Sequence, residues 1–166
     1  LAFGAHGASL TWDADTGTTG PQDGGGTWAT GAAGWWNGSA NVNWTASDVP
    51  TFGAGTDGNY NITVGGAITC GTPLTFNNSG YVFSAASAQA ITFGGTVAVA
   101  SGKSATISTN VALTRSAGAF TLSGPGTFNI SGPGSKFGSS SGSAATIGSG
   151  ATVNVLNGGS LFCGSS

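Results

Sequence analysis

The side chains that could carry acid–base or nucleophilic chemistry are few. The chain has one histidine, His6, no glutamate, and five aspartates, at Asp13, Asp15, Asp23, Asp48 and Asp57. A Ser-His-Asp system would have to use His6, close to a terminus where order is usually poor. A glycosidase needs two carboxylates at a set separation, and the spacing of the aspartates indicates no such pair. We therefore expect no enzyme, no catalytic residues and no cofactor.

Metal chemistry has equally little support in the sequence. Two cysteines are too few for a zinc site. The segments Asp13–Gly17 and Gly53–Gly58 each resemble pieces of a calcium loop. Calcium takes about six to eight oxygen ligands, however, and neither segment is followed by a glutamate. We expect turn and capping roles for the aspartates and no metal site.

The cysteines, Cys70 and Cys163, are the disulfide candidates of the chain. An oxidised pair is expected outside the cell, whereas two free thiols are the alternative. In a linear stack of β-coils of about 20–25 residues, they would lie near opposite ends, roughly 20 Å apart. A disulfide needs Cα atoms within about 7 Å, so a bond would then join neighbouring subunits.

Tryptophan is concentrated in the first third of the chain, at Trp12, Trp28, Trp35, Trp36 and Trp44. Trp35 and Trp36, with asparagines and aspartates nearby, are candidates to stack on sugars and so to bind a polysaccharide. The alternative is that the tryptophans form an aromatic core that caps one end of a β structure. The core interpretation is favoured, because that region has few other large side chains.

Five Asn-x-Ser/Thr sequons are candidates for glycosylation, at Asn37, Asn43, Asn61, Asn77 and Asn129. Attached glycans would solubilise a surface that has few charges. Charged residues make up only 5% of the chain, and its formal net charge is −2. Such a surface favours association with copies of itself and excludes a phosphate backbone as partner. No apolar run approaches the ~20 residues of a membrane span.

The elements that must position these residues are strands. The 32 glycines interrupt the sequence too often for long helices, and apolar residues recur in pairs at i and i+2. Turn formers separate the pairs, and Ser-Gly-Pro-Gly occurs twice, at 123–126 and 131–134. We expect one all-β domain over 1–166, with a tryptophan-rich part (1–60) and a strand-repeat part (61–166). The spacing favours a parallel β-solenoid, or β-helix, over a β-sandwich or jelly roll with an exchanged N-terminal strand.

Several segments resemble autotransporter-associated β-strand repeat proteins. They include Leu10–Asp15, Gly26–Trp28, Trp35–Ser39 and Asn43–Trp44, then Phe52–Gly53, Ile62–Val64, Leu74–Phe76, Gly80–Tyr81 and the glycine-rich unit Leu122–Phe128. The resemblance implies secretion, a parallel β-helix, and a passenger or surface-fibre role in bacteria. It implies no catalytic residues.

Taken together, these features predict an extracellular or cell-surface structural subunit that assembles with copies of itself into a fibre or filament. The absence of methionine fits a chain from which a secretory signal has been removed. The alternative is a carbohydrate-binding or adhesive module of a larger secreted protein.

Overall fold

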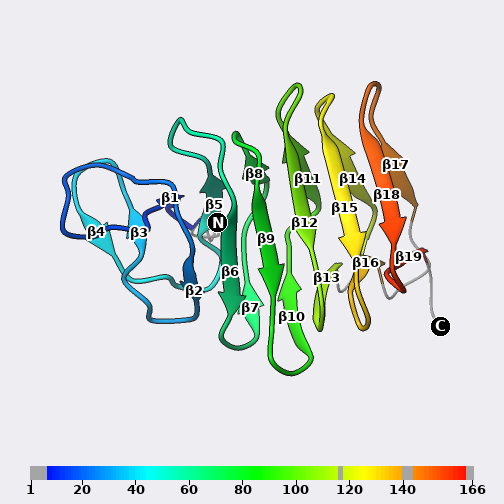
Figure 1. The fold of residues 1–166 in the computed structure, drawn as a ribbon, viewed down its shortest axis with the longest axis horizontal. Coiled ribbons are helices and arrows are strands. Elements are labelled where there is room, and N and C mark those ends of the chain that lie inside the picture. Colours follow the sequence, from blue (N-terminus) through cyan, green and yellow to red (C-terminus); the bar gives the residue numbers. More distant parts are fainter. Residues whose placement is uncertain (1–6, 116–117, 140–143, 164–166) are drawn as a thin grey trace, which may run out of the picture.

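The described chain is built from strands and turns alone. The structure is a computed structural model, and it describes residues 7–115, 118–139 and 144–163. Within these ranges there are 19 strands and no helix, which confirms the all-β prediction. In Figure 1 the strands follow one another along the long axis of the molecule, from the N-terminal part to the C-terminal coil.

The strands belong to three sheets, here named A, B and C. Sheet A contains β1 (Ser9–Trp12), β3 (Trp35–Trp36), β4 (Asn41–Val42), β5 (Val49–Phe52), β8 (Leu74–Phe76), β11 (Thr96–Val99), β14 (Phe120–Ser123) and β17 (Ala145–Ile147). Sheet B contains β2 (Gly26–Trp28), β6 (Tyr60–Val64), β9 (Tyr81–Ser84), β12 (Ser104–Ile107), β15 (Thr127–Ser131) and β18 (Thr152–Leu156). Sheet C contains β7 (Ile68–Thr69), β10 (Gln89–Thr92), β13 (Val111–Arg115), β16 (Lys136–Ser139) and β19 (Ser160–Cys163).

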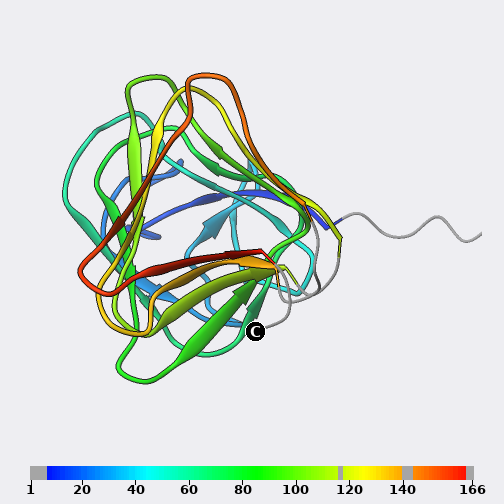
Figure 2. The same cartoon turned by 90° about the vertical axis from the view of Figure 1, so that its right-hand side faces the viewer.

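From β5 onward, each turn of the solenoid, here called a coil, gives one strand to each sheet. Its strands pair in parallel with those of the neighbouring coils. Register partners on neighbouring coils are between 21 residues apart, as for Ile62 and Phe83, and 25 residues apart, as for Ile130 and Val155. The view along the axis shows the chain winding around a common interior (Figure 2). The fold is therefore the predicted parallel β-solenoid, and the sandwich alternative is wrong.

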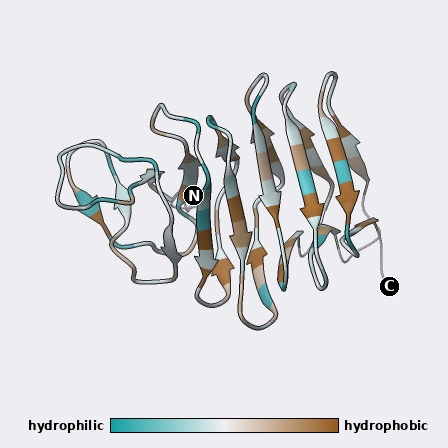
Figure 3. Cartoon of the chain, in the orientation of Figure 1, coloured by the Kyte–Doolittle hydropathy of each residue, from teal (hydrophilic) through white to brown (hydrophobic). Residues whose placement is uncertain are grey.

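The period-two pattern of the sequence explains the coil. Each strand turns alternate side chains inward, and inward residues of successive coils stack in columns. One column of sheet C runs through Ile68, Ile91, Leu113, Phe137 and Leu161. All but the last of these side chains are at most 1% exposed. Hydrophobic residues fall on the strands of every coil (Figure 3), so each added coil extends one continuous core.

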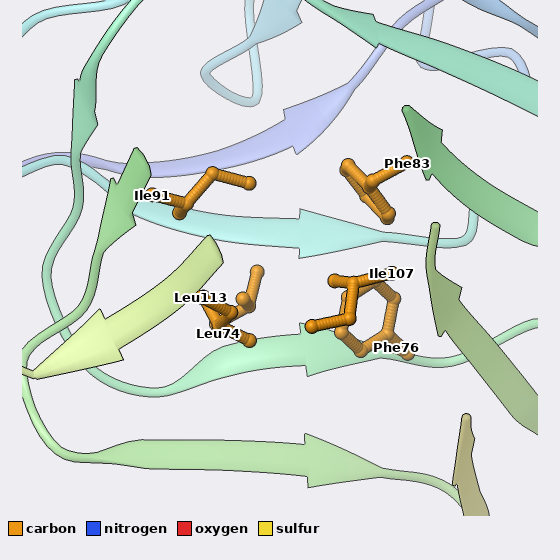
Figure 4. A pocket seen from close by; sticks show the side chains of 6 residues that line it. All are labelled: Leu74, Phe76, Phe83, Ile91, Ile107 and Leu113. Atoms are coloured by element: carbon orange, nitrogen blue, oxygen red, sulfur yellow. The ribbon is translucent and has the colours of Figure 1, made fainter. Parts of the chain in front are cut away.

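The interior between the sheets is packed. Leu74, Phe76, Phe83, Ile91, Ile107 and Leu113 converge from sheets A, B and C (Figure 4). The space between them does not admit a water-sized molecule. This part of the solenoid is therefore a core and offers no internal ligand site.

Glycine makes the corners at the two Ser-Gly-Pro-Gly copies possible. Gly124 and Gly132 have φ angles of 82° and 94°, a left-handed region that favours residues without a Cβ. A Cβ on Gly124 would collide with the backbone of Val99 on the preceding coil. The repeated motif is thus a corner that lets adjacent coils approach closely.

The N-terminal part closes one end of the solenoid. The first described strand, β1, pairs in parallel with β5 and in antiparallel fashion with β3, and β3 continues into β4. The predicted alternative of an exchanged N-terminal strand is therefore wrong, because β1 completes sheet A of its own chain. Residues 1–60 and 61–166 share one cluster of buried apolar side chains. Among the described residues, no helix is long and apolar enough to cross a membrane.

Candidate functional site

Four of the five tryptophans form the core of the N-terminal end. Trp12, Trp28, Trp35 and Trp44 are each at most 2% exposed. Their ring centroids lie 4.5 to 5.4 Å apart where they touch, as in the pairs Trp35–Trp44 and Trp12–Trp35. Phe52 of β5 lies 5.4 Å from Trp28 and 4.9 Å from Phe83, so it joins this cluster to the coils. We call the cluster and the segments around it, residues 7–48, the aromatic cap.

The buried indole nitrogens of the aromatic cap differ in their hydrogen bonding. The indole nitrogen of Trp12 donates a hydrogen bond to the carbonyl oxygen of Gly24 at 3.0 Å. The buried indole nitrogens of Trp28, Trp35 and Trp44 have no hydrogen-bond partner within the described residues. Because buried tryptophans usually find a partner, ring contact rather than hydrogen bonding holds these three in place.

Asp13 locks two segments of the cap together. It is 1% exposed, and its Oδ1 accepts hydrogen bonds from the backbone N–H groups of Asp15 and Gln22. Its Oδ2 accepts one from the Nδ2 of Asn41 at 2.6 Å. The loop after β1 is therefore fixed against β4. Asp15 in turn accepts from the backbone of Gly17 and the hydroxyl of Thr18, as expected for a turn residue.

The other aspartates also hold backbone in place. Asp48 accepts hydrogen bonds from the N–H groups of Ala8 and Thr45. Asp23 accepts from the loop at Ala54 and Thr56 and from the hydroxyl of Tyr81 at 2.5 Å. Each carboxylate thus serves as a structural acceptor, as the turn and capping interpretation predicts.

Asp57, in the loop before β6 of the first coil, forms an ion pair with a later coil. Its carboxylate lies 2.8 Å from the Nζ of Lys103 and accepts a hydrogen bond from the N–H of Ser79. The hydrogen bond from Lys103, followed by that from Ser79, lowers the pKa of Asp57 from its ordinary 3.8 to about 2. The loop before β6 is thereby tied to two later coils.

Trp36 differs from its neighbour in the sequence. Trp35 points into the aromatic cap and is fully buried, whereas Trp36 is partly exposed. This follows from the alternation of side chains along β3. Of the two candidate sugar-binding tryptophans, Trp35 is therefore core and Trp36 lies at the surface.

Trp36 lines a shallow pocket of about 360 Å³ on the outside of the cap. Its other walls are the loop Thr16, Gly17, Thr18 and Thr19, and the hairpin residues Ser39, Ala40 and Asn41. The lining combines one indole ring with hydroxyl and amide groups and contains no charged side chain. Sequence analysis missed the threonines and Asn41, because nothing in the sequence places a loop after β1 beside the β3–β4 hairpin.

The opposite end of the solenoid is open. The final strands of the described chain, β17, β18 and β19, each have a paired neighbour on one side only. Four large apolar side chains are exposed here: Ile147 at 43%, Val155 at 46%, Leu156 at 47% and Leu161 at 40%. We call β17, β18 and β19 together the C-terminal coil.

Three of these four exposed residues continue the interior columns. Ile147 pairs with Leu122, Val155 with Ile130, and Leu161 with Phe137. Their partners on the preceding coil are fully buried. The columns thus end on side chains that another coil would cover.

Both cysteines are free; Cys163 lies in β19 of sheet C, and Cys70 directly follows β7 of the same sheet. Cys163 pairs with Ser139 and Ser139 with Arg115, whereas Cys70 follows Thr69, the partner of Thr92. Continuing that register places both cysteines in one column, four strand spacings or about 19 Å apart. Burial raises the pKa of the Cys70 thiol to about 12, whereas Cys163 is exposed. Pairing Cys70 with another subunit would first require its exposure.

The glycosylation candidates divide by exposure. Asn37, Asn43, Asn61 and Asn77 are exposed. Asn129 is partly buried and belongs to a ladder on sheet B, where its Nδ2 donates to Thr106 and its Oδ1 accepts from Asn154. The first four remain predicted sites. His6 lies outside the described residues.

Comparison with protein-family models, with curated proteins and with solved structures finds no match. The resemblance to autotransporter-associated repeats thus stays a prediction from the sequence.

Proposed function

We propose that the chain is an extracellular structural subunit that assembles with copies of itself into a surface fibre. The observation that carries this proposal is the C-terminal coil, where no described residue covers three strand edges and the ends of three apolar columns. Unpaired edges are templates for strand addition by another chain. The few surface charges provide little repulsion against such contact.

The elementary contact joins the C-terminal coils of two copies. A two-fold axis between the copies sets their edge strands antiparallel, a pairing that β-sheets readily form. The contact covers Ile147, Val155 and Leu161 on both sides. A fibre needs a second contact, for which we propose β2, β4 and β7, the strands that end the three sheets at the cap side.

The hydrogen bonds that the carboxylates accept support a structural rather than a catalytic role. All five aspartates accept hydrogen bonds that fix loops or strands. A general base or nucleophile needs a side chain that remains available to a substrate.

The test measures self-association by sedimentation velocity over a range of concentrations, with negative-stain microscopy of the same samples. Val155→Asp places a charge on the open edge and should weaken association at least about tenfold. Val82→Asp is the matched control, because Val82 lies in the middle of sheet B, on the outer face of β9. Wild-type protein that stays monomeric at several hundred micromolar, or equal weakening by both variants, would overturn the proposal.

A second candidate function, a carbohydrate-binding or adhesive module of a larger secreted protein, is favoured by one observation. Trp36 is the partly exposed tryptophan, and it lies in a pocket lined by hydroxyl and amide groups.

A further inference from the structure

We infer that the pocket at Trp36 is a subsite for one or two residues of a neutral polysaccharide. This inference deepens the second candidate function, and it does not depend on self-assembly. The volume of the pocket, about 360 Å³, is at the lower end of the ~300–1,000 Å³ typical of small-molecule sites. That size fits a small neutral unit rather than a peptide or a nucleotide chain.

The indole of Trp36 supplies the apolar surface of the subsite. A pyranose ring has a flat face of C–H groups and a rim of hydroxyls. A partly exposed indole matches that face, because it is flat and apolar and its desolvation is favourable. β3 lies between β1 and β4, with Trp36 paired to Thr11 and Asn41, so the ring is carried by a sheet rather than by a loop.

The polar walls supply the groups that a sugar rim requires. The hydroxyls of Thr16 and Thr19 make no hydrogen bond within the described residues, so both are available as donors and acceptors. Asn41 donates through Nδ2 to Asp13, which leaves its Oδ1 to accept from a sugar hydroxyl.

The absence of a charged side chain among the lining residues selects for a neutral ligand. Two carboxylates lie next to the pocket: Asp15 accepts hydrogen bonds from Gly17 and Thr18, and Asp13 accepts one from Asn41. Their negative charge disfavours anionic sugars such as uronates. The predicted ligand class is therefore a neutral glycan.

Asp13 is a positioning residue for this subsite. It is buried and joins the two walls, since it binds the loop through the N–H groups of Asp15 and Gln22 and the hairpin through Asn41. A cavity whose walls are joined by a buried, fully hydrogen-bonded carboxylate is largely pre-formed, which lowers the entropic cost of binding.

The test uses retention on insoluble cellulose and chitin. It adds titration with soluble oligosaccharides of β-linked glucose, N-acetylglucosamine, xylose and mannose. Wild-type protein should bind at least one of these probes and change its tryptophan fluorescence. Trp36→Ala should weaken that binding at least about tenfold, and Trp36→Phe should restore part of it. Thr16→Val keeps the shape but removes the hydroxyl, and should weaken binding about two- to tenfold.

Phe162→Ala is the matched control, since it removes a partly exposed aromatic ring from β19 at the other end. It should bind like wild type. Failure of every probe to bind, or equal binding by wild type and Trp36→Ala, would overturn the inference. Val155→Asp should change self-association and leave retention unchanged, so failure of this inference is distinguishable from failure of the fibre proposal.

Discussion

The two ends of the described solenoid differ in how far their strand edges and apolar interior are covered. At the cap end, four tryptophans and the antiparallel strands β3 and β4 cover the first coil. The carboxylates of the cap accept hydrogen bonds from the backbone N–H groups of its loops. At the other end, the C-terminal coil leaves its strand edges and apolar columns uncovered. A solenoid is stabilised by contacts between neighbouring coils, so an end needs either a cap or another coil. Within the described residues, the C-terminal coil is therefore the part of the solenoid that is better suited to contact another chain.

The largest expected difference between the ends is in stability. Leu10 in β1 is 2% exposed and Leu161 in β19 is 40% exposed, so the same substitution tests both. Leu10→Ala should lower the free energy of unfolding by about 2–5 kcal/mol, because it removes a buried side chain and leaves a cavity. Leu161→Ala should cost less than about 1 kcal/mol.

Urea unfolding of dilute protein measures both values. Leu113→Ala is the control, since Leu113 occupies the same column as Leu161 but is fully buried, and it should resemble Leu10→Ala. Equal costs for Leu10→Ala and Leu161→Ala would contradict the contrast between a closed and an open end.

The second comparison is chemical and uses the cysteines. Cys70, near the cap, is buried with its pKa raised to about 12, whereas Cys163 is exposed on the last strand. A thiolate is the reactive form of cysteine, so the native protein at pH 8 should react rapidly at one thiol only. In denaturant both thiols should react.

Titration with a chromogenic disulfide reagent counts the thiols in each state. Cys163→Ser should abolish the rapid reaction, and Cys70→Ser should leave it unchanged. Rapid reaction of two thiols in the folded chain would show that Cys70 is accessible. Cys70 would then be able to form the predicted intersubunit disulfide.

The smallest expected effect concerns the ion pair that joins the first coil to a later coil. The pKa of Asp57 is lowered from 3.8 to about 2 in the folded chain, chiefly by Lys103. Between these values the unfolded chain binds more protons, so the free energy of unfolding should fall as the pH drops from about 4 to 2. Above about pH 4 the contribution is fully present.

Acid titration of stability, with Asp57→Asn for comparison, measures this contribution. The variant should show a smaller loss between pH 4 and 2, and added salt should reduce the difference because the ion pair is exposed. An identical pH profile for both proteins would exclude a contribution of this ion pair to the contact between the coils.

Much of the fold follows from local patterns in the sequence. Pairs such as Leu74 and Phe76 lie at i and i+2, which only a strand can place on one face. Glycine at corners such as Gly124 and Gly132 separates short strands at semi-regular spacing, which favoured the solenoid. The concentration of tryptophan before residue 45 also indicated a cap.

Contacts between residues far apart in the sequence determine which side chains are buried and where the pocket forms. Trp35 and Trp36 are adjacent and chemically identical, yet only the pairing of β3 with β1 and β4 determines which of them is buried. The pocket depends on Asp13 and Asn41, 28 residues apart, and local patterns carry no information on such a contact. Whether Leu161 is core or surface likewise depends on a neighbouring coil, because a strand buries its side chains only against what stacks on it.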